Sequence, residues 1–244
     1  MAAENTELKE LMESRSQMYN MLGRVFMEEI DAATLKELRS MRFPRNTGNA
    51  DIDAAYLDLY KFLRRPAESV LDDLAIDFAR TFLGVGDMEA RAAYPFESVY
   101  TSPRGLLMQD AREQVLAIDK SEHLERVLRS LNNEGEDHLS LELLFMREMA
   151  IRTAAALESG DEGLAVSNLL TQRNFLNDHL LNWTHMWADD VPLYTKQAFY
   201  PAFARLLMAF LLEERDLLAE LVGEDPEAAK AEESSDDTTA PATE

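Results

Sequence analysis

The sequence predicts an all-α protein that folds as one compact unit. Nine glycines and eight prolines are few for 244 residues, and leucine, alanine, methionine and glutamate, which favour helices, are frequent. Apolar residues recur at spacings of three and four along most of the chain, whereas the alternating pattern of strands is nearly absent. We therefore expect long helices in a single domain over residues 1–222.

The first third of the chain predicts four helices. They are expected over about residues 5–30, 31–41, 50–64 and 66–84. Leu22 and Phe26 belong to an apolar stripe on the first helix. Asp31 can cap the second helix, Pro66 suits the start of the fourth, and Gly84 suits its end.

The remainder predicts a loop and five more helices. The loop is expected over residues 85–101, and the helices over about 102–118, 121–131, 137–157, 161–182 and 195–222. Ser102 and Pro103 resemble a cap and a first helical residue, and Asp137 can cap the long helix that follows it. Trp183, Trp187 and Pro192 fall in the expected connection between the last two helices.

The C-terminal segment, residues 223–244, differs in composition from the rest. It holds eight acidic residues, one lysine and no aromatic or branched aliphatic side chain. Such a segment buries too little apolar surface to offset the entropy of ordering it. We expect a disordered acidic tail.

Charge restricts the partners of this protein. The formal net charge is −22, which opposes approach to nucleic acids and to anionic membranes and favours basic partners. The acidity can equally serve solubility alone. The chain has no cysteine, so disulfides and thiol chemistry are excluded. No apolar run reaches the roughly 18 residues of a membrane span, and the first residues do not resemble a secretory signal, so we expect a cytoplasmic protein without membrane insertion.

Motifs for catalysis and cofactors are not found in the sequence. The four histidines, at positions 123, 138, 179 and 185, do not have the spacing of a metal site. Glycine-rich phosphate loops, dinucleotide motifs and nucleophile elbows are missing as well. The 12 methionines could serve an adaptable binding surface, but in helical proteins they more often belong to the core. We therefore expect no enzyme activity, no cofactor and no metal.

Two stretches are unusual for their positions. The segment Tyr94–Tyr100, with the sequence YPFESVY, places three aromatic residues and a proline between helices, where polar turn residues are normal. We call it the first motif. The segment Glu134–His138, with the sequence EGEDH, is acidic and precedes a long helix. We call it the second motif; ordinary helix capping is its simplest explanation.

These stretches resemble the signatures of the TorD/DmsD/NarJ family of redox enzyme maturation chaperones. The first motif and the apolar residues after it, up to position 116, are similar to the first family signature. Residues 134–146 are similar to the second signature, with Gly135 where the family usually has proline. A His-x-x-x-Trp run within residues 175–211 also resembles the family, and the likeness spans about residues 8–222.

The resemblance implies a TorD-like fold of about ten helices and a chaperone function. Family members bind the twin-arginine signal peptide, or nearby regions, of the catalytic subunit of a molybdopterin oxidoreductase until the cofactor is inserted. A basic and apolar peptide needs an apolar groove with carboxylates near one end. We expect aromatic, leucine and methionine side chains within residues 94–108 to form that groove and Glu97, Glu136 and Asp137 to face the arginines. The full set of expected peptide-binding residues is Tyr94, Pro95, Phe96, Glu97, Ser98, Val99, Tyr100, Leu107, Glu136, Asp137, His138 and Glu142.

Other interpretations remain open from the sequence. A helical adaptor or scaffold unrelated to redox enzymes explains the missing catalytic motifs equally well, but gives no account of the first motif. A hydrolase built on a helical bundle is the enzyme alternative, and it lacks the expected ligand spacings. A hinge near residues 132–137 would allow either a monomer or a domain-swapped dimer.

Overall fold

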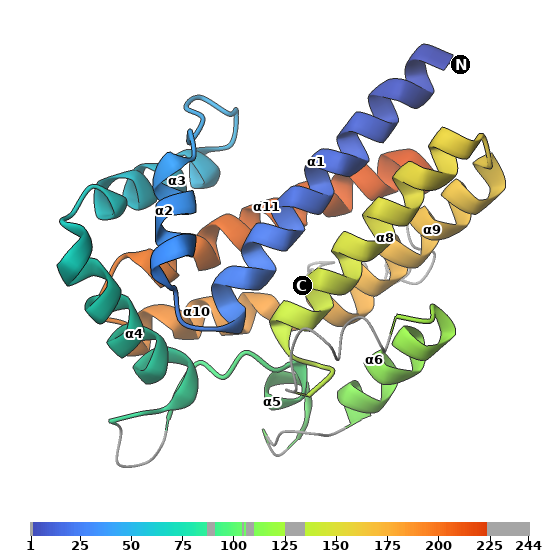
Figure 1. Ribbon diagram of the computed structural model, residues 1–244. Helices are drawn as coiled ribbons and strands as arrows, with labels where there is room; N and C mark the ends of the chain where they lie inside the picture. Colours follow the sequence, from blue (N-terminus) through green and yellow to red (C-terminus); the bar gives the residue numbers. More distant parts are fainter. Residues whose placement is uncertain (1, 87–90, 104, 106–109, 125–134, 224–244) are drawn as a thin grey trace, which may run out of the picture.

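The computed structural model describes residues 2–86, 91–103, 105, 110–124 and 135–223, and this part of the chain is built from helices (Figure 1). The α-helices are α1 (Ala2–Met27), α2 (Ala32–Ser40), α3 (Ala50–Leu63), α4 (Ala67–Leu83), α5 (Glu97–Thr101), α6 (Asp110–Ser121), α8 (Leu139–Ser159), α9 (Glu162–Phe175), α10 (Thr184–Tyr194) and α11 (Phe199–Val222). A π-helical turn, η1 (Leu176–Leu180), continues α9. The described residues thus confirm the predicted all-α class with ten α-helices.

Four long helices form one side of the molecule. α1 lies along α8, α8 packs against α9, and α11 contacts both α9 and α1 (Figure 1). α1 and α8 are antiparallel, because Lys9 near the start of α1 pairs with Glu158 at the end of α8, with 2.9 Å between Nζ and Oε1. Near the other end of α1, Gly23 approaches the start of α8 so closely that a Cβ there would lie 3.3 Å from the backbone oxygen of Ser140.

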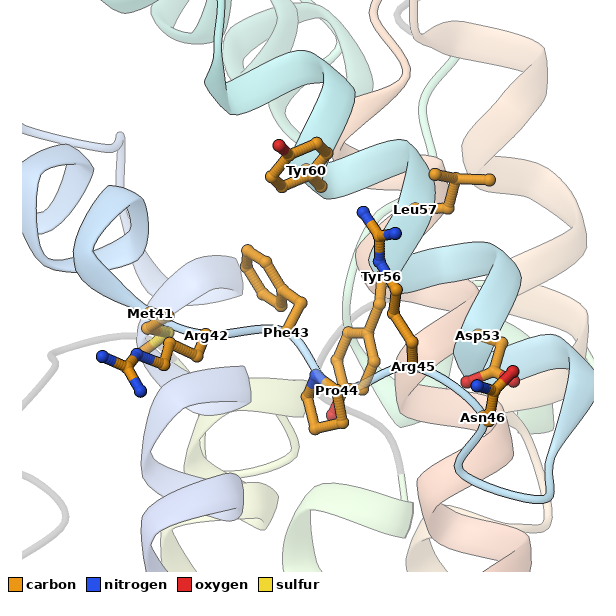
Figure 2. Close-up of a pocket in the computed structure, with 10 residues that line it drawn as sticks. All are labelled: Met41, Arg42, Phe43, Pro44, Arg45, Asn46, Asp53, Tyr56, Leu57 and Tyr60. Atoms are coloured by element: carbon orange, nitrogen blue, oxygen red, sulfur yellow. The ribbon is translucent and has the colours of Figure 1, made fainter.

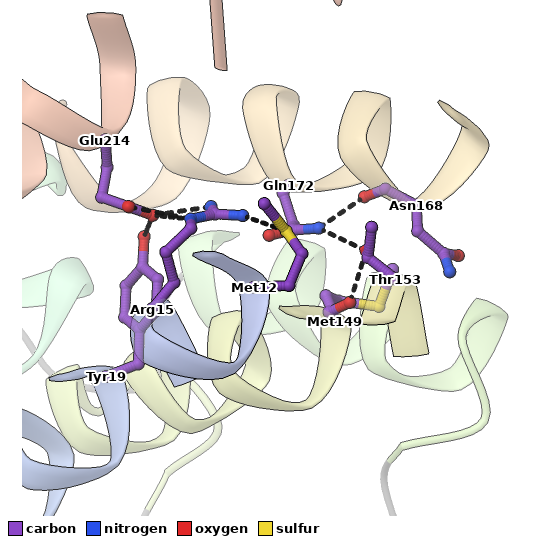
Figure 3. A network of polar contacts seen from close by, with 8 residues as sticks. All are labelled: Met12, Arg15, Tyr19, Met149, Thr153, Asn168, Gln172 and Glu214. Atoms are coloured by element: carbon purple, nitrogen blue, oxygen red, sulfur yellow. Dashed lines mark hydrogen bonds and ion pairs between the residues drawn. The ribbon is translucent and has the colours of Figure 1, made fainter. Parts of the chain in front are cut away.

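A buried ion pair joins α1 to α11. The Arg15 guanidinium donates from Nε to Glu214 Oε1 at 2.8 Å and from Nη2 to Oε2 at 2.6 Å, and both side chains are 3% exposed (Figure 3). Tyr19 donates its hydroxyl to Oε2 of the same carboxylate at 2.7 Å. These bonds satisfy both charges inside the core, which is the condition under which a buried pair is tolerated.

On the other side of the molecule, aromatic side chains form a core that is covered by α2, α3, α4 and α10. Phe82 of α4 stacks on Trp187 of α10 at 6.1 Å between centroids, and Phe62 of α3 contacts Phe199 of α11 at 5.4 Å. Asp77, a buried residue of α4, accepts hydrogen bonds from the backbone N–H groups of residues 196 and 197. The connection between α10 and α11 is thereby fixed to α4.

Local signals placed several helix ends where the structure has them. Asp31 caps α2, accepting the Thr34 N–H at 2.7 Å. Gly84 ends α4 in the left-handed conformation, with φ of 70°, which glycine adopts without a Cβ clash.

The methionines that are fully buried, Met12, Met146 and Met149, belong to the hydrophobic core.

Three expected element boundaries were wrong in the middle of the chain. The predicted loop 85–101 contains α5, so Ser102 lies at the C-terminal end of a helix and does not begin one. α6 begins at Asp110, later than the predicted 102, although residues 104 and 106–109 are outside the described part. Ser121 ends α6 and does not start a helix, and most of the predicted helix 121–131 lies outside the described residues.

The region between the last two predicted helices was also interpreted wrongly. α9 gives way to η1 at Leu176, and the expected connection contains a full helix, α10, which includes Pro192. The predicted acidic tail, apart from Gly223, lies outside the described residues. Among the described helices, none is both long and apolar enough to span a bilayer.

Candidate functional site

The two motifs singled out in the sequence lie against each other, at the junction of α5 and α8. Phe96 and His138 form an antiparallel β-bridge, and the Glu97 N–H donates to the Asp137 carbonyl oxygen at 3.0 Å. The ring of Phe96 meets the imidazole of His138 edge to face, with 4.8 Å between centroids. Segments about 40 residues apart in sequence are therefore joined by backbone and side-chain contacts.

Asp137 holds the start of α5. One carboxylate oxygen, Oδ2, accepts the backbone N–H of Ser98 at 3.1 Å, and Asp137 is fully buried. A carboxylate stabilises the N–H groups at a helix start, so this contact explains why so short a helix forms here. The sequence predicted Asp137 as the cap of α8, and that prediction was wrong because the side chain is committed to α5.

His138 takes the capping position on α8 instead. Its Nδ1 accepts the backbone N–H of Ser140 at 3.1 Å, which requires the proton of the neutral imidazole to sit on Nε2. Burial lowers the pKa of His138 to about 4, and the side chain is only 4% exposed. The imidazole is therefore neutral over the physiological pH range.

Glu97 of the first motif points into the protein. Its side chain is 2% exposed, with Oε2 at 3.0 Å from His179 Nδ1 and Oε1 accepting from Asn182 Nδ2 at 2.7 Å. A proton on His179 Nδ1 makes that ring the donor. The contacts fix α5 to η1 and to the segment that follows it.

Glu142, on the first turn of α8, completes a group of three buried carboxyl groups. Burial raises the pKa of Glu142 well above its usual range, and the nearby Glu97 and Asp137 raise it further. The protonated form is thereby favoured. Oε2 of Glu142 accepts weakly from Trp183 Nε1 at 3.3 Å, while the same indole donates to the His179 carbonyl at 2.6 Å.

Several polar atoms of this group lack a hydrogen-bond partner within the described residues. They are Asp137 Oδ1, Glu142 Oε1, Ser98 Oγ and Ser140 Oγ, all of which are buried. Asp137 Oδ1 is a carboxylate acceptor, whereas Glu142 Oε1 can carry the proton that the raised pKa of Glu142 favours. A buried acceptor without a donor lowers the stability of the folded state by about 1–3 kcal/mol. The junction therefore holds more buried polar atoms than its own hydrogen bonds satisfy.

The side chains at the surface of the junction are mainly aromatic. Tyr94, Phe96, Val99 and Tyr100 are half-buried, whereas Pro95 is buried. The Tyr100 ring stacks on that of Trp183 at 5.5 Å, and burial followed by the neighbouring Asp190 raises the Tyr100 pKa. Of the expected apolar residues, Leu107 lies outside the described part.

Glu136 is also engaged within the chain. Its Oε2 accepts from Arg112 Nε of α6 at 2.6 Å, and the Glu136 side chain is 8% exposed. Beside it, a Cβ on Gly135 would lie 3.0 Å from Asp137 Oδ1 and 3.6 Å from the Phe96 ring. The glycine therefore permits close packing of the second motif on the first.

The carboxylates expected at one end of an open groove are not exposed in this arrangement. Glu97, Glu136, Asp137 and Glu142 are all buried, and the cavities described between α2 and α3, beside α1 and beside α9 have other linings. The sequence expectation overlooked burial because carboxylates are usually exposed. Within the described residues, no group of three histidine, aspartate or glutamate side chains is arranged to hold a metal ion.

Sequence reasoning did not assign roles to several residues of the junction. They are His179, Asn182, Trp183 and Asp190. His179 and Trp183 are the His-x-x-x-Trp pair of the third segment, and a spacing of four places both on one helical face. That spacing was the one sequence signal that could have predicted that His179 and Trp183 face the junction together.

Comparison with known proteins gives consistent matches over most of the chain. A family model described as the nitrate reductase delta subunit matches residues 46–189. The chain is 31% identical over 225 residues to the chaperone protein TorD of Vibrio cholerae (serotype O1, strain O395), covering 89% of this chain and 98% of that protein. It is 28% identical to the TorD chaperone of Vibrio vulnificus over 219 residues, covering 87% and 98%, and 26% identical to that of Aliivibrio fischeri over 216 residues, covering 84% and 94%.

Proposed function

The chain belongs to the TorD/NarJ family, and from this premise we propose that it is a chaperone for the maturation of a redox enzyme. Its client is the catalytic subunit of a molybdopterin oxidoreductase. The chaperone binds the twin-arginine signal peptide or the apo subunit in the cytoplasm and holds it until the cofactor is inserted. Export or membrane docking then follows. The chaperone itself performs no catalysis in this proposal.

The observation that carries the proposal is the junction of the two motifs. The half-exposed rings of Tyr94, Phe96 and Tyr100 supply an apolar edge, and beside them Asp137 Oδ1 is a buried carboxylate oxygen without a donor among the described residues. A signal peptide offers an arginine pair next to an apolar stretch, which matches both parts. Carboxylates bind guanidinium groups through charge-assisted hydrogen bonds in a fixed fork geometry.

Access to the carboxylates requires α5 to move. Glu97 and Asp137 are enclosed by α5, α8 and η1, so an arginine reaches them only when the first motif lifts away from the second. The unpaired Asp137 Oδ1 lowers the free energy needed for this opening, because its burial is unfavourable in the closed form. A guanidinium donor then satisfies that oxygen in the complex.

The test is a calorimetric titration of the full chain with a twin-arginine signal peptide and with a copy in which both arginines are lysines. We expect the arginine peptide to bind at least tenfold more tightly, because lysine cannot form the bidentate contact. Asp137→Asn should lower the affinity about tenfold by removing one charged acceptor. Phe96→Ala should also weaken binding, through the lost apolar edge.

Asp189→Asn is the matched control, since Asp189 is an exposed carboxylate on the neighbouring α10. It should bind the peptide like the wild type. Thermal melts of each variant establish that α5 and α8 still fold. The proposed receptor is rejected if folded Asp137→Asn and Phe96→Ala proteins both keep wild-type affinity, or if the lysine peptide binds as tightly as the arginine peptide.

The domain organisation and oligomeric state stay predictions. The proposed hinge at residues 132–137 is described only from Gly135, where the chain turns into α8. Exchange of helices about such a hinge would give a domain-swapped dimer, and a fixed turn would give a monomer. Light scattering at several protein concentrations distinguishes the two.

A further inference from the structure

A second recognition feature lies away from the motif junction, in a pocket of about 490 Å³ between α3 and the segment that connects α2 to it (Figure 2). Its walls are mainly aromatic and apolar, from Phe43, Pro44, Tyr56, Leu57 and Tyr60. Leu57 is 45% exposed and Tyr60 38% exposed, although both are large apolar side chains. A concave, partly aromatic surface of this size is typical of ligand sites.

Arginine side chains surround the pocket. The Arg45 guanidinium lies 5.7 Å and that of Arg64 5.3 Å from the centroid of the Tyr60 ring, and Arg64 Nη1 donates to the Tyr60 hydroxyl at 2.5 Å. Arg42 lines the pocket next to Met41 (Figure 2). Within the described part of the chain, none of these three arginines has an ion pair.

The single carboxylate that lines the pocket is already engaged. Asp53 Oδ1 accepts from the Thr47 N–H at 3.0 Å and from the Thr47 hydroxyl at 3.1 Å. The lining holds two arginines, Arg42 and Arg45, against this one aspartate and is therefore locally basic on a chain whose net charge is −22. A charge opposite to that of the whole protein favours an anionic group at this one place.

The backbone of the connecting segment is also available for pairing. Met41 is extended, with φ of −65° and ψ of 143°, and the chain turns at Asn46, with φ of 59°. Between them, the N–H groups of Arg42, Phe43 and Arg45 make no hydrogen bond to another described residue. These N–H groups are therefore available to donate to a bound peptide.

We propose that this pocket binds an extended segment of a partner polypeptide in which acidic side chains flank an aromatic or large aliphatic residue. The apolar residue packs against the wall formed by Phe43, Tyr56 and Tyr60, and the acidic residues pair with Arg42 and Arg45. The backbone of the segment accepts hydrogen bonds from the N–H groups that follow Met41. None of these residues belongs to the motif junction, so the inference does not depend on the proposed chaperone function.

The protein's own C-terminal segment matches this chemistry only in part. Residues 224–244 are acidic, but they include no aromatic or branched aliphatic side chain that could fill the apolar pocket. A partner segment with both properties fits better. The same reasoning predicts that a peptide with acids alone binds weakly.

The experiment measures fluorescence anisotropy of a labelled nine-residue peptide with a central phenylalanine and aspartate at alternate positions. We expect binding to the full chain to weaken about tenfold in Arg42→Gln/Arg45→Gln, from the loss of two exposed ion pairs. The control Lys196→Gln/Arg215→Gln removes two exposed positive charges elsewhere and should bind like the wild type. Peptides with asparagine for aspartate, or alanine for phenylalanine, should each bind at least threefold more weakly.

Three competitors identify the occupant. Unlabelled twin-arginine peptide should not displace the probe, because it is directed to the other site. Displacement by ATP or GTP at lower concentration than the unlabelled probe would overturn the proposal in favour of a nucleotide, and tighter binding of a peptide with the sequence of residues 224–244 would assign the pocket to the protein's own tail. Equal affinity of the wild type and the arginine double variant would also overturn it.

Discussion

The substitution His138→Asn should make the protein less sensitive to acid. In the folded protein, burial lowers the pKa of His138 from 6.5 to about 4. Between about pH 6.5 and pH 4, the His138 imidazole is therefore protonated in the unfolded chain and neutral in the folded protein. The stability contributed by the neutral imidazole is complete above pH 6.5 and is lost as the pH falls toward 4.

The size of the effect follows from the shift in pKa. A difference from 6.5 to about 4 corresponds to about 3 kcal/mol in total, at 1.36 kcal/mol per pKa unit. About 2 kcal/mol of this should be lost between pH 8 and pH 5. Asparagine does not titrate and is itself a favourable helix cap, so it can keep the hydrogen bond to the Ser140 N–H.

The assay is urea unfolding followed by circular dichroism at pH 8, 7, 6 and 5. The variant loses packing against Phe96 at every pH, so only the change with pH is diagnostic. The free energy of unfolding of the wild type, minus that of the variant, should fall by about 2 kcal/mol from pH 8 to pH 5. His185→Asn, which removes an exposed imidazole, is the control and should parallel the wild type. Parallel wild-type and His138→Asn curves would refute the assignment of a neutral, buried His138.

Three further substitutions test other parts of the fold. Glu142→Gln should gain stability relative to the wild type as the pH is raised from 5 to 9, because the raised pKa of Glu142 makes ionisation unfavourable in the folded state. Urea unfolding measures the free energy of unfolding of both proteins across that range. A difference between them that does not change with pH would contradict the raised pKa. Arg15→Met should cost about 3–5 kcal/mol by leaving Glu214 buried without its partner. Arg15→Met/Glu214→Leu/Tyr19→Phe, which also removes the hydroxyl that donates to Glu214, should have a free energy of unfolding within about 1 kcal/mol of that of the wild type. Equal losses in the two variants would contradict the ion-pair interpretation. Gly23→Ala should lower the free energy of unfolding by about 1–3 kcal/mol, since its Cβ would press on the α8 backbone. Gly163→Ala, whose Cβ would have no contact closer than 3.7 Å, should raise it by about 0.5–1 kcal/mol. Thermal melts that rank the two variants in the reverse order would contradict the close packing of α1 on α8.

Local sequence signals predicted the helices whose ends depend on nearby residues. The Asp31 side chain bonds three residues ahead, and Gly84 ends α4 through its own backbone conformation. Such contacts can be predicted from a few neighbouring positions. The apolar periodicity of α1 and α11 is similarly local, because spacings of three and four define one helical face.

The errors lie where distant residues decide the local structure. α5 has five residues, and its start is held by Asp137, which is 39 positions away from the Ser98 N–H that it accepts. Ser102 and Pro103 favour a helix start when taken alone, but α5 ends there through its own backbone bond from Ser102 to Ser98. Tertiary contacts of this kind override local propensity.

The contact between the two motifs was predicted, but the burial of their carboxylates was not, and peptide binding by these residues stays a prediction. The two motifs were expected together because of a family resemblance, and Phe96 and His138 do pair. Sequence alone treats Glu97 and Asp137 as surface groups, since carboxylates rarely enter a core without partners. The partners of Glu97, His179 and Asn182, come from a segment more than 80 residues away, and no local pattern joins them to it.

The pairing of Arg15 with Glu214 has a consequence for synthesis of the protein. A ribosome that has completed α1 must add almost 200 further residues before the partner of Arg15 exists, and α8, on which α1 lies, comes more than 100 residues after α1. The apolar stripe of α1 therefore lacks two of its neighbours, α8 and α11, until more than half of the described chain has been made. We expect nascent chains that stop before α11 to be bound by general folding factors and cut readily by proteases, and folding to become cooperative only once α11 has left the exit tunnel.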